Sequence, residues 1–358
     1  MFRNRRAVRW LAGLFVLLLL TTGCNREPRS SISDSAQNKV EVIDSIGRKV
    51  EIAYPVTRAA LSNAYNAELV TAIGAIDRIV GVDYHIFQDQ EGFQHRFTEN
   101  MVIGQSQNEL NYEKIIELQP QVVILTSNGS WKEAEEKLRP FGIAVLCVDS
   151  YYTEQFEKNV LLLGKIFGED QKASELSDYF TSRLKYIEEQ LKEVPKRTVY
   201  FEYRSPGRTT FPGDYFFEMV RLSQGENIFQ DAKGRTVDLE AVVERNPQYI
   251  VKVSDENIYS SYVPPKREEM EQTMGKILNR TGWDQVDAVR NHRILLLSHY
   301  AHGGASKLVG TMYIAKYLYP EYLPDLDPEE VFRTWVTRFQ RLEYPNGHVL
   351  SLQELTQR

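Results

Sequence analysis

The sequence has few of the residues that build disulfide scaffolds or small metal and redox centres. Only two of its 358 residues are cysteine, and no Cys-x-x-Cys pair occurs. A disulfide framework, a zinc-ribbon site and a dithiol redox site are therefore excluded. The chain also lacks the Gly-x-Ser-x-Gly, His-Glu-x-x-His, Gly-x-Gly-x-x-Gly and Walker A patterns. The common sequence signals of hydrolases, zinc proteases and nucleotide-binding enzymes are thus missing.

An excess of positive charge is missing as well. The formal net charge is −6, from 43 basic and 49 acidic residues. Polyanions are bound mainly through Lys and Arg, so we do not expect general nucleic-acid binding. The proportion of 42% hydrophobic to 26% charged residues is typical of a globular protein, and the length suggests about two domains.

The chain has one notable apolar run, over residues 10–20, and four arginines precede it. A membrane-spanning helix needs about 20 such residues, so this run is too short. A basic start, a short apolar run and the small residues before Cys24 predict a secretory signal peptide over 1–23. Its removal takes away four arginines and no acid, which changes the formal charge from −6 to −10. The alternative is a buried N-terminal helix.

Cys24 resembles the lipidated cysteine of bacterial lipoproteins, although Thr21 stands where such signals usually have Leu. The polar segment that follows then reads as a lipid-anchored tether over 24–39. We expect export, with anchoring to the outside of the cell membrane through the lipid. The other cysteine, Cys147, lies in a short apolar run typical of a buried strand, and we assign it no chemistry.

An internal repeat suggests two related halves. Residues 110–124 and 237–251 align at a constant offset of 127, with Glu, Glu, Pro and Gln at matching positions. In each copy an Asn or Asp that can cap a helix is followed by helical spacing, a proline and a β-rich run. The repeat therefore predicts two similar α/β units.

Apolar runs alternate with helical patterns on both sides of a long segment, 154–194, that is almost free of Gly and Pro after Gly168. Leu176, Phe180, Leu184 and Ile187 recur there at helical spacing. We predict an α/β fold of two Rossmann-like lobes, 40–153 and 195–342, joined by one long bridging α-helix in 154–194. Residues 343–358 are expected to form a tail.

Several stretches resemble the substrate-binding proteins of ABC importers for ferric siderophores, haem and cobalamin, whose two lobes are joined by one backbone helix. The resemblance covers about 40–342 and rests on these stretches: 45–52, 111–124, 225–229, 237–251, 281–294 and 310–320. It implies a monomeric receptor, not an enzyme, with a ligand cleft between the lobes and with an ABC permease and its ATPase as partners. It implies no cofactor apart from the ligand.

Candidate ligand-binding residues follow the predicted strands, because ligands of α/β sheets bind beyond the carboxyl ends of the strands. Arg204 and Arg208 could pair with carboxylate or catecholate oxygens, and tyrosines could wall a flat chelate. His299 and His302 could meet one metal ion, but no third ligand is evident. The full set is Tyr65, Tyr84, His85, Asn128, Tyr203, Arg204, Arg208, Tyr215, His299 and Tyr300.

The resemblance also implies one exposed Glu on each lobe that contacts the permease. We select Glu133 in the first lobe, with Glu135 as the alternative, and Glu268 in the second, with Glu256 and Glu269 as alternatives. The expected function is capture of an iron chelate. Haem, cobalamin, or a small metal ion or oxyanion are alternative ligands, and a secreted enzyme that processes metals or chelates is the alternative of another class.

Overall fold

The computed structural model describes residues 38–257 and 261–356. The predicted signal peptide over 1–23, the lipidation residue Cys24 and nearly all of the tether over 24–39 lie outside these residues. Within the described ranges, no helix combines the length and apolar character that a membrane crossing requires.

The first lobe is built on a parallel sheet with the strand order β4-β3-β7-β8. Each of these strands matches an apolar run of the sequence. The hairpins β1–β2 and β5–β6 are antiparallel additions. The strands are β1 (Lys39–Ile43), β2 (Lys49–Ala53), β3 (Ala59–Leu61), β4 (Ile79–Val82), β5 (Gly104–Ser106), β6 (Glu109–Leu110), β7 (Val122–Leu125) and β8 (Ala144–Cys147). The helices are α1 (Ala64–Ala72), α2 (Tyr84–Gln88), α3 (Tyr112–Leu118) and α4 (Trp131–Leu138).

The second lobe has a five-stranded sheet with the order β10-β9-β11-β12-β13, in which only β13 is antiparallel. The segment 343–358, expected as a tail, therefore supplies an edge strand. The strands are β9 (Arg197–Tyr203), β10 (Gly225–Asn227), β11 (Tyr249–Val253), β12 (Ile294–Leu297) and β13 (Val349–Ser351). The helices are α7 (Phe217–Leu222), α8 (Leu239–Arg245), α9 (Arg267–Leu278), α10 (Asp287–Arg290), α11 (His299–Gly303), α12 (Leu308–Leu318), α13 (Pro328–Thr334) and α14 (Leu352–Thr356).

The internal repeat corresponds to α3–β7 and α8–β11. Asn111 and Asp238 cap the two helices, each accepting a hydrogen bond from a backbone N–H of the first turn. The repeated glutamine also has one role in both lobes. Gln121 Oε1 accepts from Arg58 N at 3.0 Å, and Gln248 Oε1 accepts from Thr198 N at 3.0 Å. Each glutamine thus ties the start of one strand to its neighbour in the sheet.

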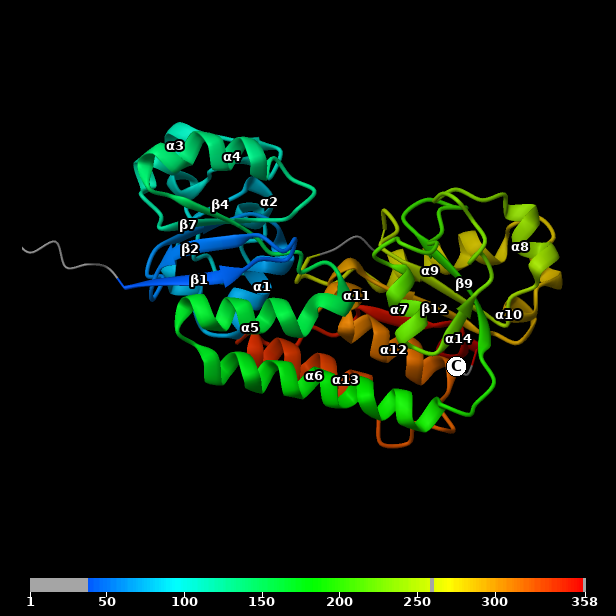
Figure 1. The fold of residues 1–358 in the computed structure, drawn as a ribbon. Coiled ribbons are helices and arrows are strands. Elements are labelled where there is room, and N and C mark those ends of the chain that lie inside the picture. Colours follow the sequence, from blue (N-terminus) through cyan, green and yellow to red (C-terminus); the bar gives the residue numbers. More distant parts are fainter. Residues whose placement is uncertain (1–37, 258–260, 357–358) are drawn as a thin grey trace, which may run out of the picture. The chain divides into compact units, whose positions relative to one another are not determined.

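The segment between the lobes forms two packed helices, α5 (Phe156–Phe167) and α6 (Asp170–Leu191), which Figure 1 shows side by side. Gly168 ends α5 in a left-handed conformation with φ 67°. Gly164 permits the close approach, since an added Cβ would lie only 2.3 Å from the Ala173 Cβ. α6 leads into β9 and is about 33 Å long at 1.5 Å per residue, which matches the predicted bridging helix.

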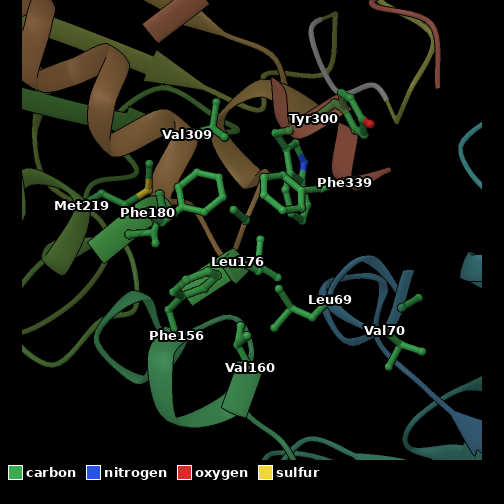
Figure 2. Close-up of a cluster of buried hydrophobic side chains, with 14 of the residues drawn as sticks. Leu69, Val70, Phe156, Val160, Leu176, Phe180, Met219, Tyr300, Val309 and Phe339 are labelled. Carbon is green, nitrogen blue, oxygen red and sulfur yellow. The ribbon is translucent and has the colours of Figure 1, made fainter. Parts of the chain in front are cut away.

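A central core lies against one face of both sheets. In β7, Val122 and Ile124 join this core, whereas Val123 belongs to a separate cluster on the other face. In β12, Leu297 joins the central core and Leu296 faces a third cluster. Each sheet is therefore buried on both faces, as expected for parallel strands with continuous apolar runs. Figure 2 shows part of the central core, where side chains of α5 and α6 meet those of both lobes.

Candidate ligand-binding site

A buried carboxylate organises the edge of the first sheet, where β3 and β4 end. Asp83 accepts hydrogen bonds from the Ser62 hydroxyl and from the Asn63 backbone N–H, the latter at 2.9 Å. Its other oxygen caps α2. One side chain therefore holds the starts of α1 and α2 together. Tyr65 and His85, in the first turns of these helices, both line the same cavity.

A serine–histidine cluster organises the corresponding edge of the second sheet. The Ser254 hydroxyl, just after β11, lies 3.2 Å from His299 Nδ1 and 2.6 Å from His302 Nε2. Ser298 caps α11 by accepting from Ala301 N at 3.2 Å. This arrangement fixes the imidazole of His299 at the carboxyl end of the sheet.

The two edges border one cavity of about 680 Å³. Its walls come from both lobes and combine aromatic rings with amide, hydroxyl, imidazole and carboxyl groups. The lining includes Asn63, Tyr65, Glu68, Asp89, Phe93, Gln107, Arg204, His299 and Tyr300. The volume falls within the range of about 300–1,000 Å³ that small-molecule sites in proteins occupy.

The pKa values of two carboxyl groups in this cavity, Glu68 and Asp89, are raised. Burial raises the pKa of Glu68 to about 8, and the nearby Asp89 carboxylate adds to the shift. Burial also raises the pKa of Asp89. At pH 7 a carboxyl with a pKa of about 8 is mostly protonated, so Glu68 can donate a hydrogen bond to a ligand.

The pKa values of two buried basic groups, His299 in the lining and Lys307 behind it, are lowered. Burial, helped by the positive charges of Lys307 and Arg204, lowers the pKa of His299 to about 4. The imidazole is therefore neutral at pH 7. Lys307 is buried behind Tyr65, with its Nζ 4.3 Å from the centre of that ring. Burial lowers the pKa of this lysine to about 7.

Five of the ten candidate binding residues line the cavity: Tyr65, His85, Arg204, His299 and Tyr300. They come from the ends of four different strands, which agrees with the rule that ligands bind beyond the carboxyl ends of a sheet. Arg204 is exposed, whereas Tyr300 is largely buried.

The other five candidates lie outside the lining of this cavity. Tyr203 is buried against Phe216, and the Arg208 guanidinium lies 4.7 Å above the Tyr203 ring. Tyr215 packs against the same Phe216. The remaining two are Tyr84, half-buried beside Phe87, and Asn128, exposed but bonded to Gln107 Nε2 at 2.8 Å.

The proposed histidine pair is close together but has no evident third ligand. The rings of His299 and His302 are 5.1 Å apart, and both contact the Ser254 hydroxyl. Over residues 38–257 and 261–356, no group of three or more His, Cys, Asp or Glu side chains is positioned to hold a metal ion.

The glutamates selected for permease contact lie on exposed helix surfaces. Glu133 forms an ion pair with Lys137 at 2.7 Å on α4, and its alternative Glu135 pairs with Arg48 at 3.1 Å. Glu268 is exposed in the first turn of α9. Of the two alternatives in the second lobe, Glu256 pairs with Lys276 at 3.4 Å and Glu269 accepts from Lys266 N at 2.8 Å.

Several residues of the site were not among the sequence candidates. Glu68 lies three positions after Tyr65, so helical spacing places both on one face of α1. Gln107 accepts hydrogen bonds from the Thr126 hydroxyl and amide, but its short hairpin gives no sequence signal. Ser254 directly follows a predicted strand and could have been selected by the rule that found Arg204.

The comparisons with known proteins agree with this architecture. The family model for "periplasmic binding protein" matches residues 59–301. The molybdate-binding protein MolA of Haemophilus influenzae is 25% identical over 348 residues, spanning 88% of this chain and 95% of that protein. An uncharacterized ABC transporter substrate-binding lipoprotein of Bacillus subtilis, YvrC, is 26% identical, spanning 89% and 98%.

Solved structures show the same fold. MolA bound to molybdate superimposes with a TM-score of 0.66 at 22% identity, covering 85% of this chain and 99% of MolA. The TroA-like periplasmic binding protein FepB of Veillonella parvula gives a TM-score of 0.72 at 21% identity, covering 87% and 99%. The expected two-lobed α/β fold is therefore confirmed.

The chain belongs to the periplasmic binding protein family, because the family model matches more than half of it. It is a substrate-binding protein of an ABC transporter and not an enzyme, so the alternative of a secreted enzyme is set aside.

Proposed function

We propose that this receptor captures an iron chelate of the ferric siderophore type and delivers it to an ABC permease. The main support is the cavity of about 680 Å³, which has room for an organic chelate as well as for a metal ion. A chelate that brings its own iron ligands needs walls and hydrogen bonds from the protein. The lining offers aromatic rings of Tyr65, Phe93 and Tyr300, with amides of Asn63 and Gln107.

The charge distribution supports a ligand with anionic oxygens. Arg204 offers a guanidinium that can bind two such oxygens at once. Glu68 opposes an anion less than its formal charge suggests, because its pKa is raised to about 8. Neutral His299 can contribute a ring N–H.

A small oxyanion is the second candidate ligand. Its support is the similarity to MolA, which extends over 88% of this chain. An oxyanion would use hydrogen-bond donors of the cavity lining, including Tyr65, His299 and Arg204. Such a ligand would leave much of the cavity to water, and for this reason we place it second.

The test is a binding titration by tyrosine and tryptophan fluorescence, because Tyr65 and Tyr300 border the cavity. Ferric complexes of a catecholate, a hydroxamate and citrate are compared with molybdate and with haem. Saturable quenching by at least one ferric complex, with no response to molybdate, is expected. Tight molybdate binding without any response to the ferric complexes would favour the second candidate.

Replacing Arg204 by Ala is expected to weaken binding of an anionic ferric catecholate about 10- to 100-fold. The reason is that a hydrogen bond to a charged group contributes about 1.5–3 kcal/mol. Arg208→Ala is the matched control, since it removes the same side chain from the same loop but outside the cavity lining. We expect it to change affinity less than about 3-fold. Equal losses in both variants would contradict the assignment of Arg204.

Lipid anchoring at Cys24 and docking through Glu133 and Glu268 complete the proposal. The support is the signal-like N-terminus and the exposure of both glutamates. We expect an acyl mass on the peptide that begins with Cys24.

Charge reversal at both glutamates should abolish uptake through the cognate permease, while the affinity for the ligand stays unchanged. Uptake at the original rate would remove this pair from the docking surface.

A further inference from the structure

A second cavity, of about 650 Å³, opens at the carboxyl ends of β9 and β11. These two strands are neighbours in the second sheet, and β10 lies on the opposite side of β9. The chain therefore reverses its direction of winding between β9 and β11. In α/β sheets this switch point, beyond the carboxyl ends, is where ligands bind. Arg204 follows β9 and lines both this cavity and the main one.

The backbone is strained at the residue that directly follows each of these two strands. Arg204 has φ 58° and Ser254, just after β11, has φ 51°. The left-handed region is unfavourable for residues other than glycine, and such strain is found most often at binding and catalytic sites. Hydrogen bonds hold the conformation: Arg204 N donates to Val253 O at 3.0 Å, and Lys252 Nζ donates to Arg204 O.

Positive charge is concentrated around the cavity. Its lining contains the four cations Arg204, Lys252, Lys276 and Arg280, against the two acids Asp255 and Glu256. The exposed Glu256 pairs with Lys276 at 3.4 Å. Glu202, buried behind the lining, offsets one more of these charges, so the cavity keeps a formal net charge of +1 in a chain whose overall charge is negative.

Two of these cations belong to a buried ion network. Lys252, fully buried, lies 3.0 Å from Glu202 and 3.1 Å from Asp255. Arg280 donates two hydrogen bonds to the same Glu202, at 2.7 and 3.0 Å. A guanidinium has five N–H groups, so Arg280 keeps further donors for a ligand. Apolar residues of the same volume often stabilise a protein as well as a buried ion network does. Stability alone therefore gives weak reason for this network.

We propose that the second cavity is an anion subsite, which takes a carboxylate arm of the ligand whose metal centre occupies the main cavity. Arg204 connects the two because it borders both. This inference rests on the proposed function for the metal centre, but the subsite itself rests on the cavity, the cations and the strained strand ends. It narrows the ligand class to chelates that carry a free carboxylate.

The decisive variant is Lys276→Glu. The Lys276 side chain is about half exposed, at 47%, so its replacement should leave folding intact while it reverses a charge at the subsite. Lys185→Glu is the matched control: it makes the same charge change on α6, where Lys185 pairs with Glu189 at 3.6 Å and lies outside the lining of both cavities.

The probes are metal-free citrate, ferric citrate and a neutral ferric trihydroxamate. Citrate should shift the methyl resonance of Ile277, which lines the second cavity. Lys276→Glu should weaken the binding of citrate and of ferric citrate at least 5-fold, and it should leave the affinity for the trihydroxamate unchanged. Lys185→Glu should bind all three probes with nearly the original affinity. An Ile277 signal that citrate leaves unmoved, or equal effects of the two lysine variants, would overturn the subsite. Citrate binding that Lys276→Glu weakens, with no response to any ferric complex, would keep the anion subsite and reject the iron-chelate function.

Discussion

Phe180→Ala is expected to lower the free energy of unfolding by about 3–5 kcal/mol, the usual cost of removing a buried phenyl ring. Phe180 is fully buried on α6. Its ring lies 5.5 Å from that of Phe156 on α5, 5.9 Å from Trp335 and 6.4 Å from Phe339. Figure 2 shows Phe156, Phe180 and Phe339 within one cluster. The Phe180 ring therefore links α6 to α5 and to the segment that contains Trp335 and Phe339.

The effect should reach the whole described unit and not one lobe alone. The central core is continuous from the first sheet through α5 and α6 to the second sheet. A cavity at Phe180 thus weakens contacts that both lobes share. Urea unfolding followed by circular dichroism should show one transition at a lower midpoint, without a new intermediate.

Phe141→Ala is the matched control, because it makes the same chemical change on the surface. The Phe141 side chain is 58% exposed, so its loss should change stability by less than about 0.5 kcal/mol. Loss of stability in the control as large as that in Phe180→Ala would contradict the argument from burial. Two separated transitions in Phe180→Ala would show that the core does not couple the lobes.

Much of the fold could be predicted from the sequence because the signals were strong. Continuous apolar runs correspond to the central strands, and the repeat correctly placed α3–β7 and α8–β11 in equivalent positions. The strands β10 (Gly225–Asn227) and β13 (Val349–Ser351) were not predicted. Each has only three residues and lies at a sheet edge. Three residues are too few to show the alternation of apolar and polar side chains that predicts a strand. The segment that holds β13 was therefore expected to be a tail.

The site was harder to predict, since the side of a sheet on which a residue lies depends on register. Arg204 lines the cavity, but the preceding Tyr203 alternates with it and is buried beside Phe216. Arg208 forms an isolated β-bridge with Thr236, which fixes it away from the cavity. A set of residues after a strand therefore identifies the correct edge of the sheet, but it does not say which side chains reach the ligand.

Lys307→Met is expected to change the pH dependence of the free energy of unfolding, because the charged form of Lys307 is costly to bury. Lys307 is only 1% exposed, at the start of α12. Its Nζ donates to the backbone oxygen of Tyr151 and lies 5.2 Å from the centre of the Tyr215 ring. Burial lowers its pKa from 10.5 to about 7, although the charges of Asp214, Glu154 and Glu68 oppose the shift.

The sign of the pH effect follows from proton binding. Between pH 7 and 10.5 the unfolded chain keeps this lysine protonated while the folded chain has released the proton. The wild-type protein should therefore gain stability as pH rises through this window. Below pH 7 the folded protein carries the full free-energy cost of the buried, charged lysine. Lys307→Met has no such group, so its advantage over wild type should shrink by about 3 kcal/mol between pH 7 and 9.5.

Glu68→Gln is an internal check, because Glu68 makes the stability of the wild-type protein change with pH in the opposite direction. The pKa of Glu68 is raised to about 8, so the folded chain binds an extra proton and the wild-type protein loses stability as pH rises from 4.5 to 8. The free energy of unfolding of Glu68→Gln, relative to that of the wild-type protein, should therefore increase over that pH window. Free energies of unfolding from urea titrations at several pH values measure both differences. A difference curve for Lys307→Met that stays flat from pH 7 to 9.5 would show that the lysine is solvated and does not lie buried between the aromatic rings.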